Sequence, residues 1–220
     1  MSLTKNVSVT FTTATTSAYT DPSNIDWTTP ANAEVSNDAY ATALLTKGVA
    51  LADTSFRLML TGQSGADVIP TNATITGITV SIEKSASGLA GCVDREIMLI
   101  KNGALAGNDK SLVPNWPSSD AVSTYGSSSD LWGNTLTPAN VKASNFGVSL
   151  VTQASSGTNG QTATVKVDAI TMVITYTTLR FSNNASLIGN QGNPTSLGIG
   201  TNTFGKQLKT KVGNRGKIGS

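Results

Sequence analysis

Four aspartates, Asp94, Asp120, Asp130 and Asp168, are the side chains best suited to chemistry in this chain. A pair of carboxylates can serve as acid and base in glycoside hydrolysis, and several converging oxygens can bind Ca²⁺. No spacing among these four residues identifies either arrangement. We therefore expect them to cap turns and to hold loops through hydrogen bonds, while a calcium site stays an open alternative.

The other residue types that catalyse reactions are scarce. The 220 residues include no histidine, which excludes Ser-His-Asp and Cys-His nucleophiles and histidine zinc ligands. The single cysteine, Cys92, cannot form an intrachain disulfide, and we expect it to be a small apolar filler. A reactive thiol would need a nearby cation, for which Arg95 is a conceivable candidate. Residues 200–206 almost complete a phosphate-binding loop, but Gln207 stands where Ser or Thr should hold magnesium. The sequence predicts a non-enzymatic protein with no assignable catalytic residue, cofactor or metal site.

Large aromatic residues stand in loop-like sequence, namely Trp27, Trp116, Trp132 and Tyr125. If exposed, they could stack on sugar rings, which keeps glycan as an open partner. The favoured interpretation is that they plug the ends of a β-sandwich, where each buries about 150–250 Å².

The elements that must position these residues are mostly strands. Apolar and polar residues alternate along residues 7–11, 73–83 and 146–150, and the run 165–176 is apolar on both faces at several points, as in a central strand. Ile75 is one step out of register with the residues that follow it, and a bulge at Gly77 would correct this. The residues expected to face inward are Ile75, Ile78, Val80, Ile82, Phe146, Val148 and Val173.

Two local signals fix further features. Asn102-Gly103 after the expected strand 96–101 predicts a tight hairpin turn. Thr137 followed by Pro138 predicts the N-terminus of a short helix. Short strands with turn-rich spacing and few helices predict an all-β fold, an antiparallel β-sandwich or jelly roll over residues 1–178, and periodicity does not separate these two.

Composition changes after Thr178. Residues 179–220 contain six Lys and Arg and no Asp or Glu, whereas residues 1–178 contain nine basic and thirteen acidic residues. This second segment is also rich in Gly and Asn and cannot build a core, so we expect a long extended arm that is ordered by a partner. The residues expected to bind that partner are Arg180, Phe181, Leu187, Ile188, Leu197, Ile199, Phe204, Lys206, Lys209, Lys211, Arg215 and Lys217.

Three partners could satisfy such an arm. A membrane is disfavoured because no amphipathic apolar face backs the basic residues. Nucleic acid is disfavoured because the arm offers little aromatic interleaving beyond Phe181 and Phe204. An acidic protein surface fits best, and a neighbouring copy of the same chain is the first candidate, so we expect a homo-oligomer. We see neither a signal peptide nor an apolar run of the ~20 residues that a membrane helix requires, and expect a soluble protein left in the cytoplasm where it is made.

The residues in loops also carry a resemblance to a known family. Residues 26–33 (Asp-Trp-Thr-Thr-Pro-Ala-Asn-Ala) and 36–42 open the pattern, and 69–78 (Ile-Pro-Thr-Asn-Ala-Thr-Ile-Thr-Gly-Ile) continue it. Residues 116–120, 125–126, 130–133 (Asp-Leu-Trp-Gly), 144–147 and 167–176 follow in the same order. Together they resemble a β-sandwich module common in tailed-bacteriophage virion proteins and in prophage-encoded structural proteins.

This resemblance implies a role in a virion, assembled in the host cytoplasm, with other virion proteins as partners. Capsid decoration or cement proteins, fibres and tail appendages all carry such modules. We expect a capsid decoration protein first, a neck or tail adaptor or a fibre second, and a receptor- or glycan-binding module third. The resemblance implies no catalytic residue.

Overall fold

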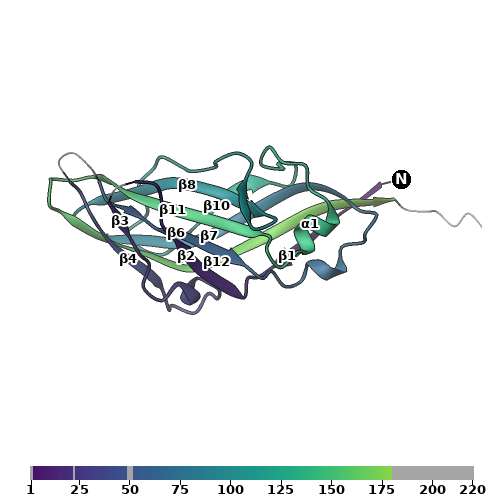
Figure 1. Cartoon of the computed structure of the whole chain (residues 1–220), viewed down its shortest axis with the longest axis horizontal. Coiled ribbons are helices and arrows are strands. Elements are labelled where there is room, and N and C mark those ends of the chain that lie inside the picture. Colours follow the sequence, from purple (N-terminus) through teal and green to yellow (C-terminus); the bar gives the residue numbers. More distant parts are fainter. Residues whose placement is uncertain (1, 22, 49–51, 180–220) are drawn as a thin grey trace, which may run out of the picture. The chain divides into compact units, whose positions relative to one another are not determined.

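The computed structural model describes residues 2–21, 23–48 and 52–179. The first sheet has the order β1-β12-β7-β10. Strand β4 also pairs with β12, along residues 162–167, whereas β1 pairs along residues 172–179. Its strands are β1 (Ser2–Val9), β4 (Ala41–Thr46), β7 (Thr74–Gly88), β10 (Ala121–Ser127) and β12 (Thr162–Leu179). Every pairing within this sheet is antiparallel, and β12 is central, as predicted. Figure 1 shows the long strands running along the body.

The second sheet is built around β11 (Gly147–Ser156). One side of β11 pairs with β8, which pairs in turn with β9, and the other side pairs with β6 and β5. The remaining strands are β2 (Thr13–Ser17), β3 (Asn24–Ile25), β5 (Thr54–Ser55), β6 (Arg57–Thr61), β8 (Gly91–Lys101) and β9 (Ala104–Ala106). Only β3 and β5 pair in parallel among these described strands. The predicted all-β antiparallel sandwich is confirmed.

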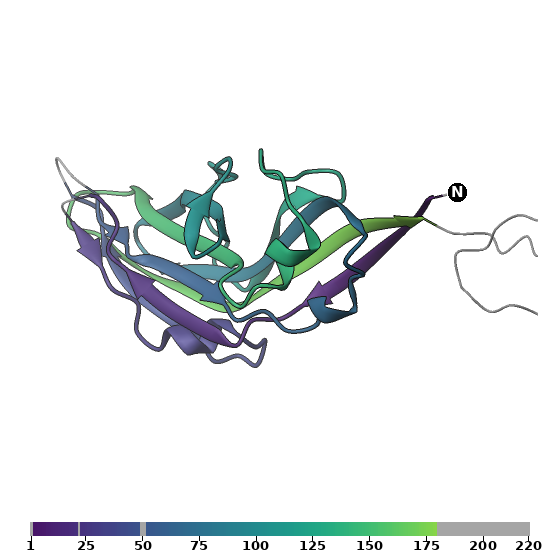
Figure 2. The same ribbon diagram turned by 45° about the vertical axis from the view of Figure 1, so that its right-hand side comes forward.

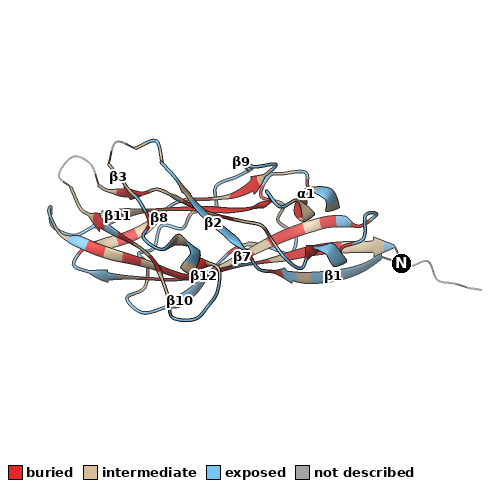
Figure 3. Ribbon diagram, turned by 60° about the horizontal axis from the view of Figure 1, so that its bottom comes forward, coloured by how far each residue is buried: buried red, intermediate tan, exposed pale blue. Residues whose placement is uncertain are grey.

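The core lies between the two sheets. Ile78, Val80 and Ile82 on β7 are fully buried, as are Phe146, just before β11, and Val148 within it. Figure 3 shows buried residues alternating with less buried ones along the strands. Deleting part of such a side chain leaves a cavity that its neighbours fill only in part, so these positions are costly to truncate.

One predicted core residue is wrongly placed. Val173 is only half-buried and pairs with Thr79, whose side chain is on the outer side of the sheet. The inner face of β12 is formed by Ile170, Met172 and Ile174 instead. Since side chains alternate along a strand, the residue between Met172 and Ile174 must point outward.

The local signals are confirmed. The pairing of β7 with β12 shifts by one residue between Ile75 and Gly77, so both Ile75 and Ile78 are buried. A Cβ on Gly77 would lie 2.2 Å from the carbonyl carbon of Ser128, which excludes any larger residue unless that loop moves. Asn102 and Gly103 have φ angles of 55° and 78°, as a type I′ hairpin turn requires.

The helices are short. Helix α1 spans Pro138–Lys142, and its capping box is formed by Thr137 and Asn140, with Pro138 in the first turn as predicted. Two 3₁₀ turns, η1 and η2, span Pro30–Ala33 and Ala66–Val68. Within the described ranges no helix is long and apolar enough to cross a membrane. The predicted arm lies outside the described residues, apart from Leu179, which ends β12.

Candidate functional site

The candidate site is a polar cluster inside the sandwich, where two charged residues face each other from opposite sheets. On β7 the inward positions Ile78, Val80 and Ile82 are followed two residues later by Lys84, which therefore also points inward. Lys84 is 3% exposed. A lysine in that position needs a partner, because burying an isolated charge is strongly unfavourable.

The partner is Asp94 on β8, and a bulge brings it there. Ile97 and Leu99 face the core, so strict alternation would turn Arg95 inward and Asp94 outward. The pairing of β8 with β11 shifts between Glu96 and Asp94, which leaves Arg95 as the extra residue. The bulge reverses the two side chains, so that Asp94 is 1% exposed and Arg95 is 45% exposed.

Four donors surround the Asp94 carboxylate. Lys84 Nζ donates to Oδ1 over 2.5 Å, and Trp116 Nε1 donates to the same oxygen over 2.7 Å. The Tyr125 hydroxyl donates to Oδ2 over 2.8 Å, and the Leu112 backbone N–H donates to Oδ2 over 3.1 Å. Lys84 Nζ also donates to the Tyr125 hydroxyl over 2.5 Å, so that Lys84, Asp94 and Tyr125 form a closed triangle.

The segment between β9 and β10 covers this cluster. The backbone N–H of Trp116 donates to the Cys92 carbonyl over 2.7 Å, and the Pro117 carbonyl accepts from the backbone N–H of Ala86 over 2.8 Å. These two bonds fix the segment to β8 and β7, one strand from each sheet. Trp116 is thereby held with its ring centroid 4.5 Å from Lys84 Nζ, a cation–π distance.

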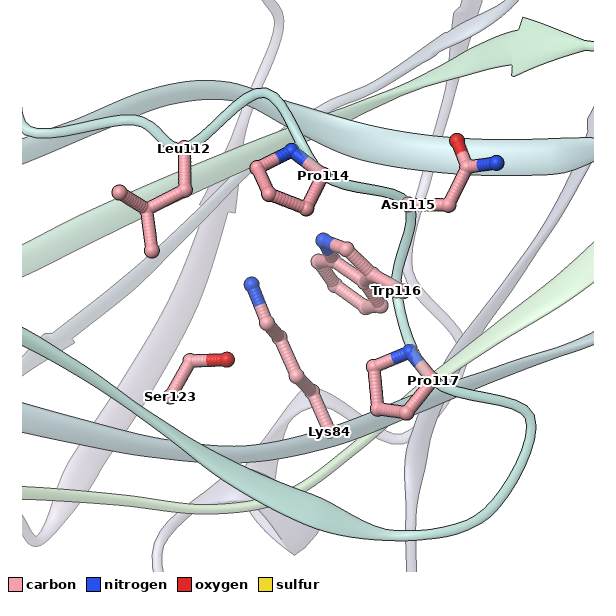
Figure 4. Close-up of a pocket in the computed structure, with 7 residues that line it drawn as sticks. All are labelled: Lys84, Leu112, Pro114, Asn115, Trp116, Pro117 and Ser123. Carbon is pink, nitrogen blue, oxygen red and sulfur yellow. The ribbon is translucent and has the colours of Figure 1, made fainter.

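A pocket of about 60 Å³ opens beside Lys84. Its lining comprises Lys84, Leu112, Pro114, Asn115, Trp116, Pro117 and Ser123. Figure 4 shows the Lys84 amine pointing into the space between Leu112, Trp116 and Ser123. Such a volume holds a few water molecules and is too small for a sugar ring or a nucleotide.

The electrostatics of the cluster follow from burial. Burial lowers the pKa of Lys84, although the adjacent Asp94 charge and hydrogen bond oppose this change. Burial, followed by the Asp94 charge and hydrogen bond, raises the pKa of Tyr125, so this phenol keeps its proton throughout the neutral range. The arrangement thus pairs an amine whose pKa is lowered with a phenol whose pKa is raised.

Comparisons with known proteins identify no family. No family model matches the chain, and no curated protein matches it. A solved structure titled "CBM4 structure and function" matches at 15% sequence identity, covers 63% of this chain and 85% of that chain, and has a TM-score of 0.33. A similarity at this level carries no function from that protein to this one.

The tryptophans are buried, as the favoured interpretation expected. Trp27, Trp116 and Trp132 are 5%, 6% and 0% exposed. The indole N–H groups of Trp27 and Trp132 donate to the carbonyls of Phe56 and Ile78 over 2.8 and 2.9 Å. None of the three presents an open ring face for a sugar to stack on. Tyr125 lies in strand β10, so its prediction as a loop residue was wrong.

The four aspartates are separated by role. Asp94 belongs to the buried cluster, whereas Asp130 accepts from Trp132 N–H over 2.7 Å, as in a loop turn. Asp120 accepts from the hydroxyls of Tyr40 and Ser85, each over 2.6 Å, and Asp168 accepts from Asn37 N–H over 3.2 Å. In the described part of the chain no group of three or more His, Cys, Asp or Glu side chains could hold a metal ion.

Cys92 is a buried free thiol, as expected, and burial raises its pKa to about 11. Sequence reasoning missed Lys84 because a lone lysine in an alternating strand is normally read as a solvent-facing residue. The signal that could have found it is its position, two residues after Ile82 on the apolar face. All twelve residues predicted to bind a partner, from Arg180 to Lys217, lie outside the described residues.

Proposed function

We propose that the protein is a non-enzymatic structural protein of a tailed-bacteriophage virion, where it decorates or cements the capsid. The observation that carries this proposal is the partition of charge along the chain. Residues 1–178 have an excess of four acidic residues, and residues 179–220 have six basic residues and no acidic ones. A chain divided in this way can bind copies of itself, basic arm to acidic body.

An acidic face on the body offers a binding surface for the arm. This face consists of Asp38, Glu83 and Asp120 around Tyr40, with the buried Asp168 beneath them, and it includes one cation, Lys166, whose Nζ lies 5.0 Å from the centre of the Tyr40 ring. The Tyr40 hydroxyl donates to Asp120, and the Ser36 hydroxyl donates to Glu83 over 3.0 Å. The hydrogen bond to Asp120, then partial burial, then the charges of Asp120, Asp38 and Asp168 raise the pKa of Tyr40 to about 12. The carboxylates of Asp38, Glu83 and Asp120 outnumber the one lysine of this face, so a basic segment would complement their charge.

The resemblance to phage virion modules supplies the proposed location. The alternatives stay a neck or tail adaptor, or a fibre. A glycan-binding role depended on exposed tryptophans, and all three are buried. Glycan binding is therefore kept only as one outcome of the test.

The test is deletion of residues 180–220. We expect the shortened protein to keep its far-UV circular dichroism but to lose self-association in sedimentation and to be absent from purified particles. Self-association of the full chain should weaken with added salt, because exposed charges are screened. A shortened protein that still assembles normally would contradict the proposal, and binding on a glycan array by the isolated body would favour the alternative.

A matched pair of variants tests the acidic face. Glu83→Gln removes one charge and keeps an oxygen acceptor for the Ser36 hydroxyl. We expect this variant to weaken self-association. Asp67→Asn, an exposed acid in η2, removes a charge outside the acidic face and should leave association unchanged. Equal effects of the two changes would show that net charge matters and that this face does not.

A further inference from the structure

Lys84 and Asp94 are the two reactants of an amide bond, held together between the sheets with a small pocket beside the lysine. They flank the connection from β7 to β8, which passes from one sheet to the other. Nζ lies 2.5 Å from Oδ1, and the two side chains are 3% and 1% exposed. Holding two reactants in this way gives effective molarities of about 10⁵–10⁸ M, which favours a condensation that free groups in water do not undergo.

We propose that Lys84 and Asp94 condense to form an intramolecular amide that covalently joins the two sheets. The Lys84 amine, as –NH₂, attacks Cγ of the Asp94 carboxylic acid, and a Cγ–Nζ bond forms. The bond from Cγ to Oδ2 then breaks, and Oδ2 leaves as water. The reaction is a dehydration with no oxidant, reductant or cofactor, and it goes beyond the virion role proposed above.

The protons required can move within the cluster. The ion pair holds three protons on Nζ; the products hold one on the amide nitrogen and two on the departing water. One proton passes from Nζ to the carboxylate when the pair neutralises. The second passes through Tyr125, whose hydroxyl accepts from Nζ over 2.5 Å and donates to Oδ2 over 2.8 Å. Tyr125 receives one proton as it gives up another, so it ends unchanged.

The other contacts suit the same reaction. Oδ1 becomes the amide oxygen, and Trp116 Nε1, 2.7 Å away, stabilises the negative charge that develops on it during attack. The pocket of about 60 Å³ beside Lys84 is large enough to receive the water that is released. Burial also lowers the pKa of Lys84, which raises the fraction of neutral amine available.

Mass spectrometry of the purified full chain tests the proposal. We expect a mass lower than that of the unlinked chain by one water molecule. Trypsin does not cleave after an acylated lysine, so digestion of the denatured protein should give one peptide from residue 58 to Arg95, uncut at Lys84 and lighter by one water. Full mass together with cleavage after Lys84 would overturn the proposal.

Single substitutions test the role of each residue in forming the amide. Lys84→Arg keeps the charge but cannot form this amide, so it should show the full mass expected for its own sequence. Lys110→Arg changes the half-exposed ion pair with Asp130 and should keep the missing water. Tyr125→Phe should form the amide more slowly, as followed by the mass of pulse-labelled protein, with unchanged circular dichroism. Formation at the wild-type rate in that variant would overturn the relay through Tyr125. The wild-type measurement decides the amide itself, even if a variant fails to fold.

Discussion

The described structure contains two Lys–Asp pairs of similar geometry in opposite environments. Lys84 and Asp94 lie between the sheets, whereas Lys110 and Asp130 are 28% and 27% exposed with Nζ 2.8 Å from Oδ2. At the surface the lysine lowers the pKa of Asp130, chiefly through the hydrogen bond. Inside, burial lowers the pKa of Lys84 in spite of its carboxylate partner. Burial therefore decides whether the loss of hydration or the attraction between the charges dominates the pKa. Removing one partner of the interior pair leaves the other charge buried and unpaired, whereas a partner left at the surface stays hydrated.

The largest expected effect comes from breaking the interior pair on one side. Asp94→Leu leaves Lys84 buried without a counter-charge, and we expect a loss of about 3–5 kcal/mol in the free energy of unfolding. The double variant Lys84→Met/Asp94→Leu removes both charges and should regain much of that loss relative to the single variant. Urea denaturation of both proteins measures the difference. A double variant no more stable than the single would contradict the interpretation that the unpaired charge is the cause.

Removing one donor to the interior carboxylate should have an intermediate effect. Trp116→Phe keeps most of the aromatic surface but deletes the N–H that donates to Asp94 Oδ1. We expect a loss of about 1–3 kcal/mol, since a buried acceptor oxygen loses a partner. Thermal unfolding with matched urea titrations would measure it. An effect within error of zero would mean that water from the adjacent pocket replaces the indole.

The surface pair should matter little. Asp130→Asn retains an oxygen that can accept from Trp132 N–H, and it loses both the charge and the oxygen that pairs with Lys110. We expect a change of about 0–1 kcal/mol, as for other half-exposed ion pairs. The same urea titration measures it at neutral pH and at high salt. A loss as large as that of Asp94→Leu would remove the distinction between the two environments.

The smallest effect is the pH dependence of that surface contribution. The pKa of folded Asp130 is lowered from 3.8, so its contribution is present above 3.8 and is lost as the pH falls through the lower folded value. The stability difference between wild type and Asp130→Asn should therefore be constant near neutral pH and vanish at strongly acidic pH. Denaturation curves at a series of pH values check this, and a difference that grew on acidification would contradict the sign.

The alternation of apolar and polar residues along the sequence predicted the buried apolar side chains and missed the buried charged pair. Ile78, Val80 and Ile82 follow a two-residue period that continues to Lys84, but a charged residue at the next inward position breaks the hydrophobic pattern. The inward orientation of Asp94 was missed for a different reason, because the bulge at Arg95 exists only through the pairing of β8 with β11. A sequence shows the period of a strand, but not where a partner strand interrupts it.

Local chemistry was more reliable than long-range placement. Asn102-Gly103 and Thr137-Pro138 act through a few neighbouring bonds, and both features were found as predicted. Val173 was misplaced because the residues of β12 are apolar on both faces, so hydrophobicity alone does not show which side meets the core. The basic arm, which carried every predicted partner-binding residue, stays a prediction.

The pairing of β1 with β12 has a consequence for synthesis on the ribosome. Figures 1 and 2 show β1 alongside the last part of β12, and Val9 pairs with Met172. At translation rates of about 5–20 residues per second, β1 waits on the order of ten seconds or more before its partner is made. Until then its unpaired edge is open to other nascent chains on the same polysome. Folding yield in the cell should accordingly depend on translation speed and on chaperones that shield this strand.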